Sequence, residues 1–184
     1  MVLNGIRTGA GLSRGAATEM ERSMTQSLRG NMDLVSDPQN LDLSVDEVFR
    51  MMLGAECALT DEPSHEENET ISAVVGFGGL LSGACVFRSG SSTALDIAAK
   101  LTGMDFDEID DTVKDAIGEV CNMLAGAWKG RIPDLSANCG LSIPAVITGS
   151  HYQIHVQAPE FRLHHNFCYE QKTFSVTIIC DGLQ

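Results

Sequence analysis

The sequence predicts an α+β domain of helices and antiparallel strands. Residues 113–130 have the periodicity of a long helix, whereas several segments after Pro133 alternate apolar and polar residues. Helices and strands come in runs, without the βαβ alternation that builds a parallel sheet. A chain of 184 residues is long enough for one such domain with a real core.

The charge balance excludes several classes of partner. The net charge is −13, whereas nucleic acids and anionic membrane surfaces are bound by clustered Lys and Arg. No apolar run approaches the roughly 18 residues of a membrane span, and the first residues lack the apolar core of a signal peptide. We therefore expect a cytoplasmic protein without nucleic-acid binding or membrane insertion.

The chain divides near residue 40. Residues 1–40 are rich in Gly, Ser, Arg and Met, a composition that favours a flexible N-terminal segment. Residues 41–184 are expected to form the folded domain. Its first helix is predicted to begin at Ser44 as N-cap, with Glu47 in the capping-box position, and to stop at Gly54.

The middle of the chain predicts a hairpin and two helices. TISAVVGF and LLSGACVFR flank Gly78-Gly79, which is a hairpin signal. Ser91 or Ser92 is expected to cap a short helix that Gly103 ends. The acidic stretch DFDEIDD precedes the long helix, where acids suit the positive end of the helix dipole.

The last third is expected to supply strands. LSIPAVITG, YQIHVQA, NFCYEQ and TFSVTIIC are the four candidates. In the last of them Phe174, Val176, Ile178 and Cys180 alternate with Ser175, Thr177 and Ile179, so the strand has one apolar face and is apolar on both faces only at its last position.

The long helix has two faces on a helical wheel. One apolar stripe is expected to pack on the sheet, and it holds Val113, Ala116, Ile117, Val120, Leu124, Ala127 and Trp128. The opposite direction carries a line of residues that we call the polar strip: Asp115, Glu119, Asn122, Gly126 and Lys129. Cys121 falls nearer the packed side.

The polar strip has two interpretations. Most outward helix faces are simply solvated. Asn122, however, is a poor residue for the middle of a helix because its amide competes for backbone hydrogen bonds. Gly118 and Gly126 flank it, and each glycine costs about 1 kcal/mol inside a helix. Because these glycines would let another protein approach closely, the sequence favours a docking surface with Asp115, Gly118, Gly126 and Lys129 as partner-binding residues.

The spacing of this helix resembles the signature of the CheC/CheX/FliY family of chemotaxis phosphatases. That signature is Asp or Ser, three residues, Glu, two residues, Asn, and a Pro about two dozen residues later. Here it reads Asp115-A-I-G-Glu119-V-C-Asn122, followed by Pro144. DAIGEVCNMLAG is most similar to CheX-like members.

The resemblance implies a function and a fold. The fold that it implies is the CheC/CheX-like α+β domain, with long helices packed on one face of an antiparallel sheet, in a homodimer. The implied substrate is the phosphoaspartate of a CheY-like receiver domain, with Asn122 placing the attacking water and Glu119 pairing with the receiver's lysine. Mg²⁺ is expected to come from the receiver, so the chain needs no cofactor of its own. The first helix has Ser44, Val48 and Met51 at the matching spacing and lacks the Glu/Asn pair, so one site is expected.

Other classes of function remain open. A CheX-like dimer without turnover would be a receiver-binding or adaptor module. Metal binding is disfavoured, because His151 and His155 would lie about 13 Å apart along a strand and the adjacent His164 and His165 would face opposite ways. The six cysteines contain no C-x-x-C pair. The acidic loop 61–69 is expected to be solvated or, at most, a weak cation site. Trp128 and Phe161 are expected in the core or at a dimer interface.

Overall fold

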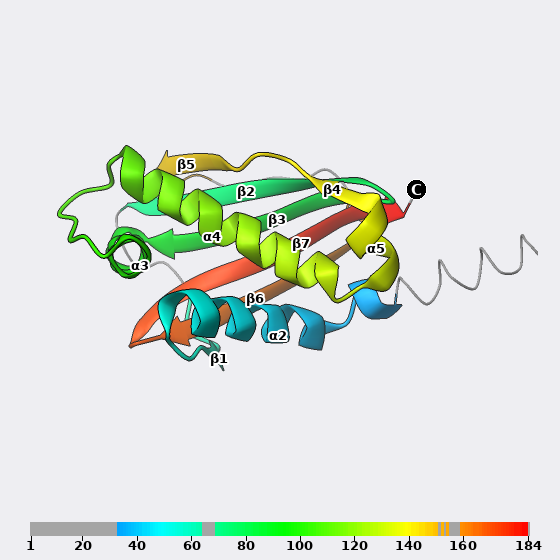
Figure 1. Cartoon of the computed structure of the whole chain (residues 1–184), viewed down its shortest axis with the longest axis horizontal. Helices are drawn as coiled ribbons and strands as arrows, with labels where there is room; N and C mark the ends of the chain where they lie inside the picture. The colour runs from blue at the N-terminus through cyan, green and yellow to red at the C-terminus, as the bar shows by residue number, and fades with distance from the viewer. Residues whose placement is uncertain (1–32, 64–68, 151, 153, 155–158, 184) are drawn as a thin grey trace, which may run out of the picture.

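The computed structural model describes residues 33–63, 69–150, 152, 154 and 159–183 (Figure 1). Most of the predicted flexible segment, residues 1–32, therefore lies outside the described residues. The remainder of that segment differs from the prediction: residues 33–35 are helical and Val35 is fully buried. The ordered domain thus begins before residue 41.

A seven-stranded sheet forms the centre of the molecule, and every strand pairing in it is antiparallel. The order is β1-β6-β7-β3-β2, and the outer edge of β2 is shared by β4 at one end and β5 at the other. The strands are β1 (Ala58–Thr60), β2 (Thr70–Gly79), β3 (Leu81–Gly90), β4 (Cys139–Leu141), β5 (Ala145–Gly149), β6 (Phe161–Tyr169) and β7 (Lys172–Leu183).

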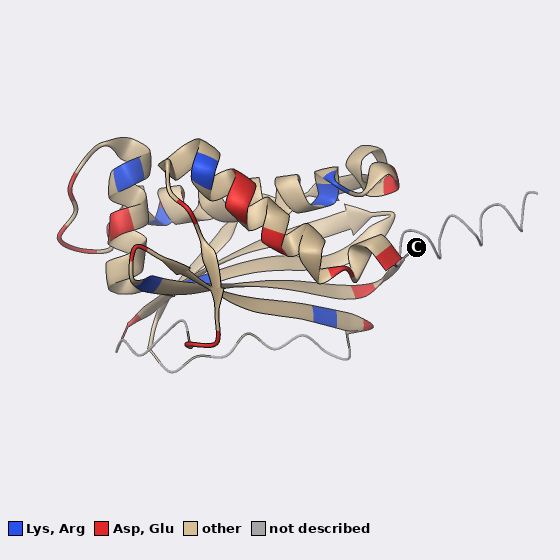
Figure 2. Ribbon diagram, turned by 90° about the horizontal axis from the view of Figure 1, so that it is seen from below, with Lys and Arg blue, Asp and Glu red and all other residues tan. Residues whose placement is uncertain are grey.

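The long helices cover one face of this sheet, which confirms the predicted fold class. In Figure 1, α4 crosses the sheet diagonally, α2 runs beside it, and α3 is seen end-on. Figure 2 shows these helices together on one side of the sheet. The helices are α2 (Pro38–Val48), continued by the π-helical turn η1 (Phe49–Leu53), α3 (Ser91–Thr102), α4 (Asp111–Gly130) and α5 (Pro133–Asn138).

The core lies between the sheet and the helices. The apolar face predicted for β7 is confirmed, because Phe174, Val176, Ile178 and Cys180 are all fully buried. Its other face is buried as well, with Ser175, Thr177 and Ile179 each at most 8% exposed. Phe174 stacks on Phe49 at the end of α2, with ring centroids 4.6 Å apart. Such aromatic pairs contribute beyond their buried area, so they fix α2 against the sheet.

The predicted start of the first helix is wrong. The helix α2 begins at Pro38, and Asp37 is its N-cap, with a carboxylate that accepts from the Gln39 backbone N–H at 3.0 Å. Ser44 lies mid-helix and buried, where its hydroxyl donates to the Asn40 carbonyl. Asp followed by Pro at the first helical position is a stronger start signal than the Ser44 capping box.

Two other predicted helix ends are confirmed, and one cap is corrected. Gly54 and Gly103 end their helices in the left-handed conformation, with φ of 63° and 71°. The short helix α3 starts at Ser91 itself, and Gly90 is its N-cap without a side-chain hydrogen bond. Ser91 instead donates to the Glu69 carbonyl at 3.1 Å. The hairpin at Gly78-Gly79 is confirmed, because β2 and β3 pair along their lengths.

The last third departs most from the prediction. The short helix α5 was not predicted. The strand predicted as LSIPAVITG is shorter, because only Ala145–Gly149 forms β5 and the first residue, Leu141, is the end of β4. In YQIHVQA, Tyr152 and Ile154 have no regular structure, and the other residues lie outside the described ones. The strand predicted as NFCYEQ begins earlier, at Phe161, and ends at Tyr169. Glu170 and Gln171 form the turn to β7 with positive φ.

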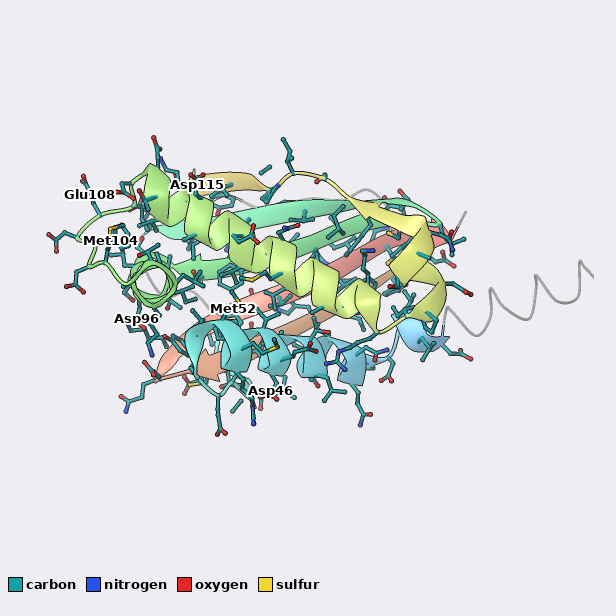
Figure 3. All side chains as sticks on the ribbon, in the orientation of Figure 1. Asp46, Met52, Asp96, Met104, Glu108 and Asp115 are labelled. Atoms are coloured by element: carbon teal, nitrogen blue, oxygen red, sulfur yellow. The ribbon has the colours of Figure 1, made fainter. Side chains whose placement is uncertain are left out.

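Asp96 links α3 to the sheet and gives the fold a pH-dependent contact (Figure 3). Its carboxylate is 3.0 Å from both Lys172 Nζ and the Tyr169 hydroxyl. Burial opposes ionisation, but the hydrogen bonds from Lys172 and Tyr169 outweigh it and lower the pKa of Asp96 below 3.8. Since the folded state favours the ionised form, this contact stabilises the fold fully above 3.8 and is lost as the pH falls through the lower folded value.

Replacing Asp96 with asparagine is therefore expected to lower the free energy of unfolding at neutral pH. The difference from wild type should shrink in acid, because the protonated Asp96 has no charge to lose. Urea unfolding of both proteins across the acidic range measures this. A difference that stays constant well below 3.8 would contradict the assignment.

Candidate functional site

The helix α4, which carries the polar strip, is fixed at its start by an N-cap and at its end by contacts to α2. Asp110 is its N-cap and accepts from the Val113 backbone N–H at 2.8 Å. Just past its end, the Arg131 guanidinium donates to the Ser44 hydroxyl and the Leu43 carbonyl of α2, each at 3.2 Å, and pairs with Glu47. Glu47, predicted to close a capping box, thus anchors α4 to α2 instead.

The two predicted faces of α4 are present in the structure. Val113, Ile117, Val120, Leu124 and Trp128 are buried against the sheet, whereas Ala116 and Ala127 are partly exposed. Cys121 points into the core, with its Sγ 3.3 Å from the Ala73 carbonyl. On the opposite side, Asp115 and Glu119 are exposed, and Asn122, Gly126 and Lys129 are partly exposed.

Glu119 and Asn122 are neighbours at the surface. Asn122 Nδ2 lies 3.5 Å from Glu119 Oε2, at the long limit of a hydrogen bond. No Lys, Arg or His among the described residues lies within 4.0 Å of the Glu119 or Asp115 carboxylate. Both acids and the Asn122 amide are therefore available to an outside partner.

Asp115 lies at the acidic end of the polar strip. Figure 3 shows it near the start of α4, close to the loop that carries Met104 and Glu108. Lys114 beside it is already engaged, because its ammonium pairs with Asp111 at 2.9 Å. Among the described residues, the charge left unpaired at this end of α4 is therefore negative, which favours a basic partner.

The prediction that Gly118 binds a partner is wrong, because Gly118 faces residues of its own chain. It is buried, and a Cβ placed there would lie 3.2 Å from the Pro144 Cβ and 3.4 Å from a Val146 methyl. The glycine lets β5 and the loop before it pack closely on α4. A helical wheel cannot reveal this contact, because residues 142–146 reach α4 only in the tertiary structure.

The loop Ser142–Pro144 was not predicted as part of the site. The Ser142 backbone N–H donates to the Gly76 carbonyl, and its Oγ accepts from the Gly76 N–H, each at 2.9 Å. Because Pro144 packs on Gly118, this pinned loop lies beside the Glu119 position. Ile143 is 89% exposed there. The spacing of Pro144 after Asn122 was the one sequence signal that pointed to this loop.

Gly126 and Lys129 have different surroundings. Apart from the backbone of α4 itself, no atom of the described residues lies within 4 Å of the position of a Cβ at Gly126, so the surface is open there. Lys129 is turned toward its own chain, where its ammonium donates to the Ser136 carbonyl at 3.0 Å. That contact holds α5 against α4, so the ammonium is already engaged by the chain itself.

Replacing Gly126 with alanine is expected to raise the free energy of unfolding by about 1 kcal/mol, because alanine is the better helix former and nothing obstructs its methyl group. Chemical denaturation measures the gain. If Gly126 admits a partner's backbone, the same variant should bind that partner more weakly. A loss of stability would show that the open surface is misassigned.

The matching positions of α2 do not form a second strip. Ser44 and Val48 are buried, and of the three only Met51 is exposed, at 75%. The Glu/Asn pair lies on α4, whereas α2 and η1 carry Ser44, Val48 and Met51 at the same spacing. The single site stays a prediction.

The sequence analysis also considered metal binding by histidines and by the acidic loop, and a core or interface role for two aromatic residues. His164 and His165 face opposite sides of β6, with Nδ1 atoms near Thr177 (2.8 Å) and Asp42 (2.6 Å). His151, His155 and residues 64–68 of the acidic loop lie outside the described residues. Within the described part of the chain, no three His, Cys, Asp or Glu side chains are grouped to hold a metal ion.

The two aromatic residues belong to the core. Trp128 lies in the core, and Phe161 packs at its margin.

The fold and the polar strip define a class of protein: an α+β domain that presents an unpaired carboxylate and an amide on a helix across its sheet. A family model described as chemotaxis phosphatase CheX matches residues 71–168, which is more than half of the chain. The CheY-P phosphatase CheX of Thermotoga maritima is 31% identical over 116 residues, covering 60% of this chain and 74% of that protein. The chain therefore belongs to the CheX family of chemotaxis phosphatases.

Solved structures share this fold. The chemotaxis protein CheX from Vibrio vulnificus superposes with a TM-score of 0.66 at 19% identity, over 77% of this chain and 94% of that chain. A CheX–CheY–BeF3–Mg²⁺ complex from Borrelia burgdorferi gives a TM-score of 0.58 at 23% identity, over 77% and 96% of the two chains. None of the helices that the structure describes is long and apolar enough to cross a membrane.

Proposed function

We propose that this chain hydrolyses the phosphoaspartate of a CheY-like receiver domain. The observation that carries the proposal is the pairing of an unengaged carboxylate, Glu119, with an accessible amide, Asn122, on the outer face of α4. Membership of a family of chemotaxis phosphatases supports the reaction. The named activity of the Thermotoga maritima relative supports the substrate.

The two side chains suit complementary parts of this reaction. An acyl phosphate is already activated, so hydrolysis requires mainly an in-line water and charge neutralisation. The carboxamide of Asn122 both donates and accepts, which allows it to hold a water opposite the leaving carboxylate. Glu119, one turn earlier, is placed to pair with a lysine of the receiver and so to orient the complex. Asp115 extends this acidic surface.

The metal in this scheme belongs to the partner. The Borrelia burgdorferi complex contains Mg²⁺ together with CheY and BeF3. We propose that a receiver brings Mg²⁺ to the present site too, and that this chain contributes no cofactor of its own. Glu119 would then pair with the receiver's lysine. We further propose that this chain and its receiver are both cytoplasmic.

The alternative is a receiver-binding or adaptor module without turnover. Both possibilities need the acidic strip, but only catalysis needs a positioned water. Decay of a phosphorylated receiver domain, followed with and without the chain, separates them. Faster release of inorganic phosphate in proportion to the added chain supports catalysis, whereas binding at an unchanged decay rate supports the adaptor.

We also propose that the chain is a homodimer. The outer strands β1 and β5 carry exposed apolar residues, Leu59 at 57% and Ile147 at 41%, and an outer strand edge allows sheet pairing across a two-fold axis. Light scattering on the full chain is expected to give twice 19.7 kDa. A mass of one chain across the accessible concentration range would contradict the dimer.

A further inference from the structure

A second polar site lies on the sheet face opposite the helices. A cavity of about 260 Å³ opens there over strands β3, β7 and β6. The strand register puts its residues side by side, because Arg88 pairs with Ser175, and Thr177 pairs with both Val86 and His164. Cross-strand neighbours on one face lie about 5 Å apart, so the polar groups converge. The lining consists of Val86, Arg88, Ile154, Arg162, His164, Ser175, Thr177 and Ile179.

Two guanidinium groups at this cavity lack an acidic partner among the described residues. No carboxylate among the described residues lies within 4.0 Å of Arg88 or Arg162. The chain has 25 Asp and Glu against 12 Lys and Arg, so an arginine has many acids available to it. Glu160, close in the chain to Arg162, directs its carboxylate to within 3.0 Å of the Cβ position at Gly182 instead.

Arg88 is held in place, although its Nε atom lacks a hydrogen bond to any described residue. Its guanidinium lies over the Tyr152 ring, 5.0 Å from the centroid, and the Tyr152 hydroxyl is fixed by the Ser72 hydroxyl at 2.8 Å. Its Nε atom is buried and has no hydrogen-bond partner in the described part of the chain. A guanidinium that has a buried, unsatisfied donor and no acid beside it among the described residues carries an uncompensated charge, and an anion in the cavity would offset that charge.

We propose that this cavity binds a phosphoryl dianion. The paired N–H donors of a planar guanidinium match the spacing of two phosphate oxygens, and two arginines neutralise the charge of the dianion. Hydroxyl and imidazole groups of Thr177 and His164, 2.8 Å apart, supply further polar contacts beside them. Val86, Ile154 and Ile179 give the cavity apolar walls, which suit the carbon chain of a small organic phosphate. The site is separate from the polar strip on α4 and does not rest on the proposed phosphatase function.

Calorimetric titration of the full chain at constant ionic strength tests this site, with inorganic phosphate and glycerol 3-phosphate as ligands and glycerol as the neutral control. Saturable binding of phosphate or its ester, and none of glycerol, is expected. Tighter binding of glycerol 3-phosphate assigns the site to organic phosphates, and equal affinity assigns it to inorganic phosphate. The absence of saturable binding by both overturns the proposal.

Variants locate the binding. Arg162→Gln is expected to weaken it by at least about tenfold, through loss of a charge-assisted contact, and Arg88→Gln should act in the same direction. Arg162 is exposed, so its replacement tests the site even where Arg88→Gln does not fold. Arg50→Gln is the matched control, because Arg50 is a surface arginine paired with Asp46 on α2. Undiminished binding by Arg162→Gln, or an equal loss in Arg50→Gln, overturns the assignment.

Discussion

Replacing Asn122 with alanine is expected to lower the accelerated decay of a receiver phosphoaspartate by about 100-fold or more. The reason is positional, because misplacing a reacting water by about 1 Å costs roughly that factor, and alanine has no group to hold the water. The helix should be unharmed, since Asn122 is partly exposed and alanine is the better helix former. Release of inorganic phosphate from the phosphorylated receiver is the measurement.

Two further variants separate catalysis from docking. Asn122→Ala should still bind a receiver loaded with BeF3 and Mg²⁺, whereas Glu119→Ala should bind it more weakly, because the unpaired carboxylate that would pair with the receiver's lysine is gone. Asn138→Ala is the matched amide control, since Asn138 is exposed on α5 and donates to its own helix at Asp134. An undiminished decay rate with Asn122→Ala would refute the catalytic role of that amide.

Replacing Trp128 with alanine is expected to lower the free energy of unfolding by about 3–5 kcal/mol, as for other large-to-small core changes. Trp128 is fully buried at the C-terminal end of α4 and packs on Phe77, with ring centroids 5.2 Å apart. The variant leaves a cavity between α4 and the sheet. Because the same helix carries Asn122, the phosphatase activity should fall together with stability as the temperature is raised.

Trp128→Phe is expected to cost much less. Phenylalanine keeps most of the apolar contact, and the indole Nε1 of Trp128 has no hydrogen-bond partner within the described part of the chain, so its removal breaks no hydrogen bond. Met51→Ala is the surface control, because Met51 is 75% exposed and its truncation should change stability by less than about 0.5 kcal/mol. Urea unfolding of the three variants measures their free energies of unfolding and so ranks them. An equal loss of stability in both Trp128 variants would contradict this explanation.

Helix faces, strand faces and helix ends could be predicted from the sequence, because residues close together in the chain determine them. The apolar stripe of α4 and the core-facing residues of β7 follow from helix and strand periodicity. Gly54 and Gly103 end their helices because glycine adopts the left-handed conformation without strain. The start of α2 was mispredicted although its signal is also local: Asp37 and Pro38 lay in a segment that composition had assigned to the flexible tail.

Strand boundaries were less predictable, because pairing partners decide them. LSIPAVITG has one continuous pattern, yet it divides where Ser142 bonds to Gly76 and interrupts the pairing with β2. The segment after Tyr169 turns instead of continuing as a strand, since β6 and β7 must be joined there as a hairpin. Such contacts join residues far apart in the chain or depend on a neighbouring strand, so a single segment does not encode them.

The sequence by itself determined the face of α4 that carries Glu119 and Asn122, and their spacing, because a helix converts residue number into direction. Only the tertiary structure decided what surrounds them. It packs Pro144 on Gly118 and turns Lys129 toward Ser136, so two residues expected to meet a partner serve the chain's own packing. It also leaves Glu119 without a basic neighbour among the described residues. The physical reason is that periodicity fixes a side chain's direction, whereas its neighbours depend on how distant segments pack.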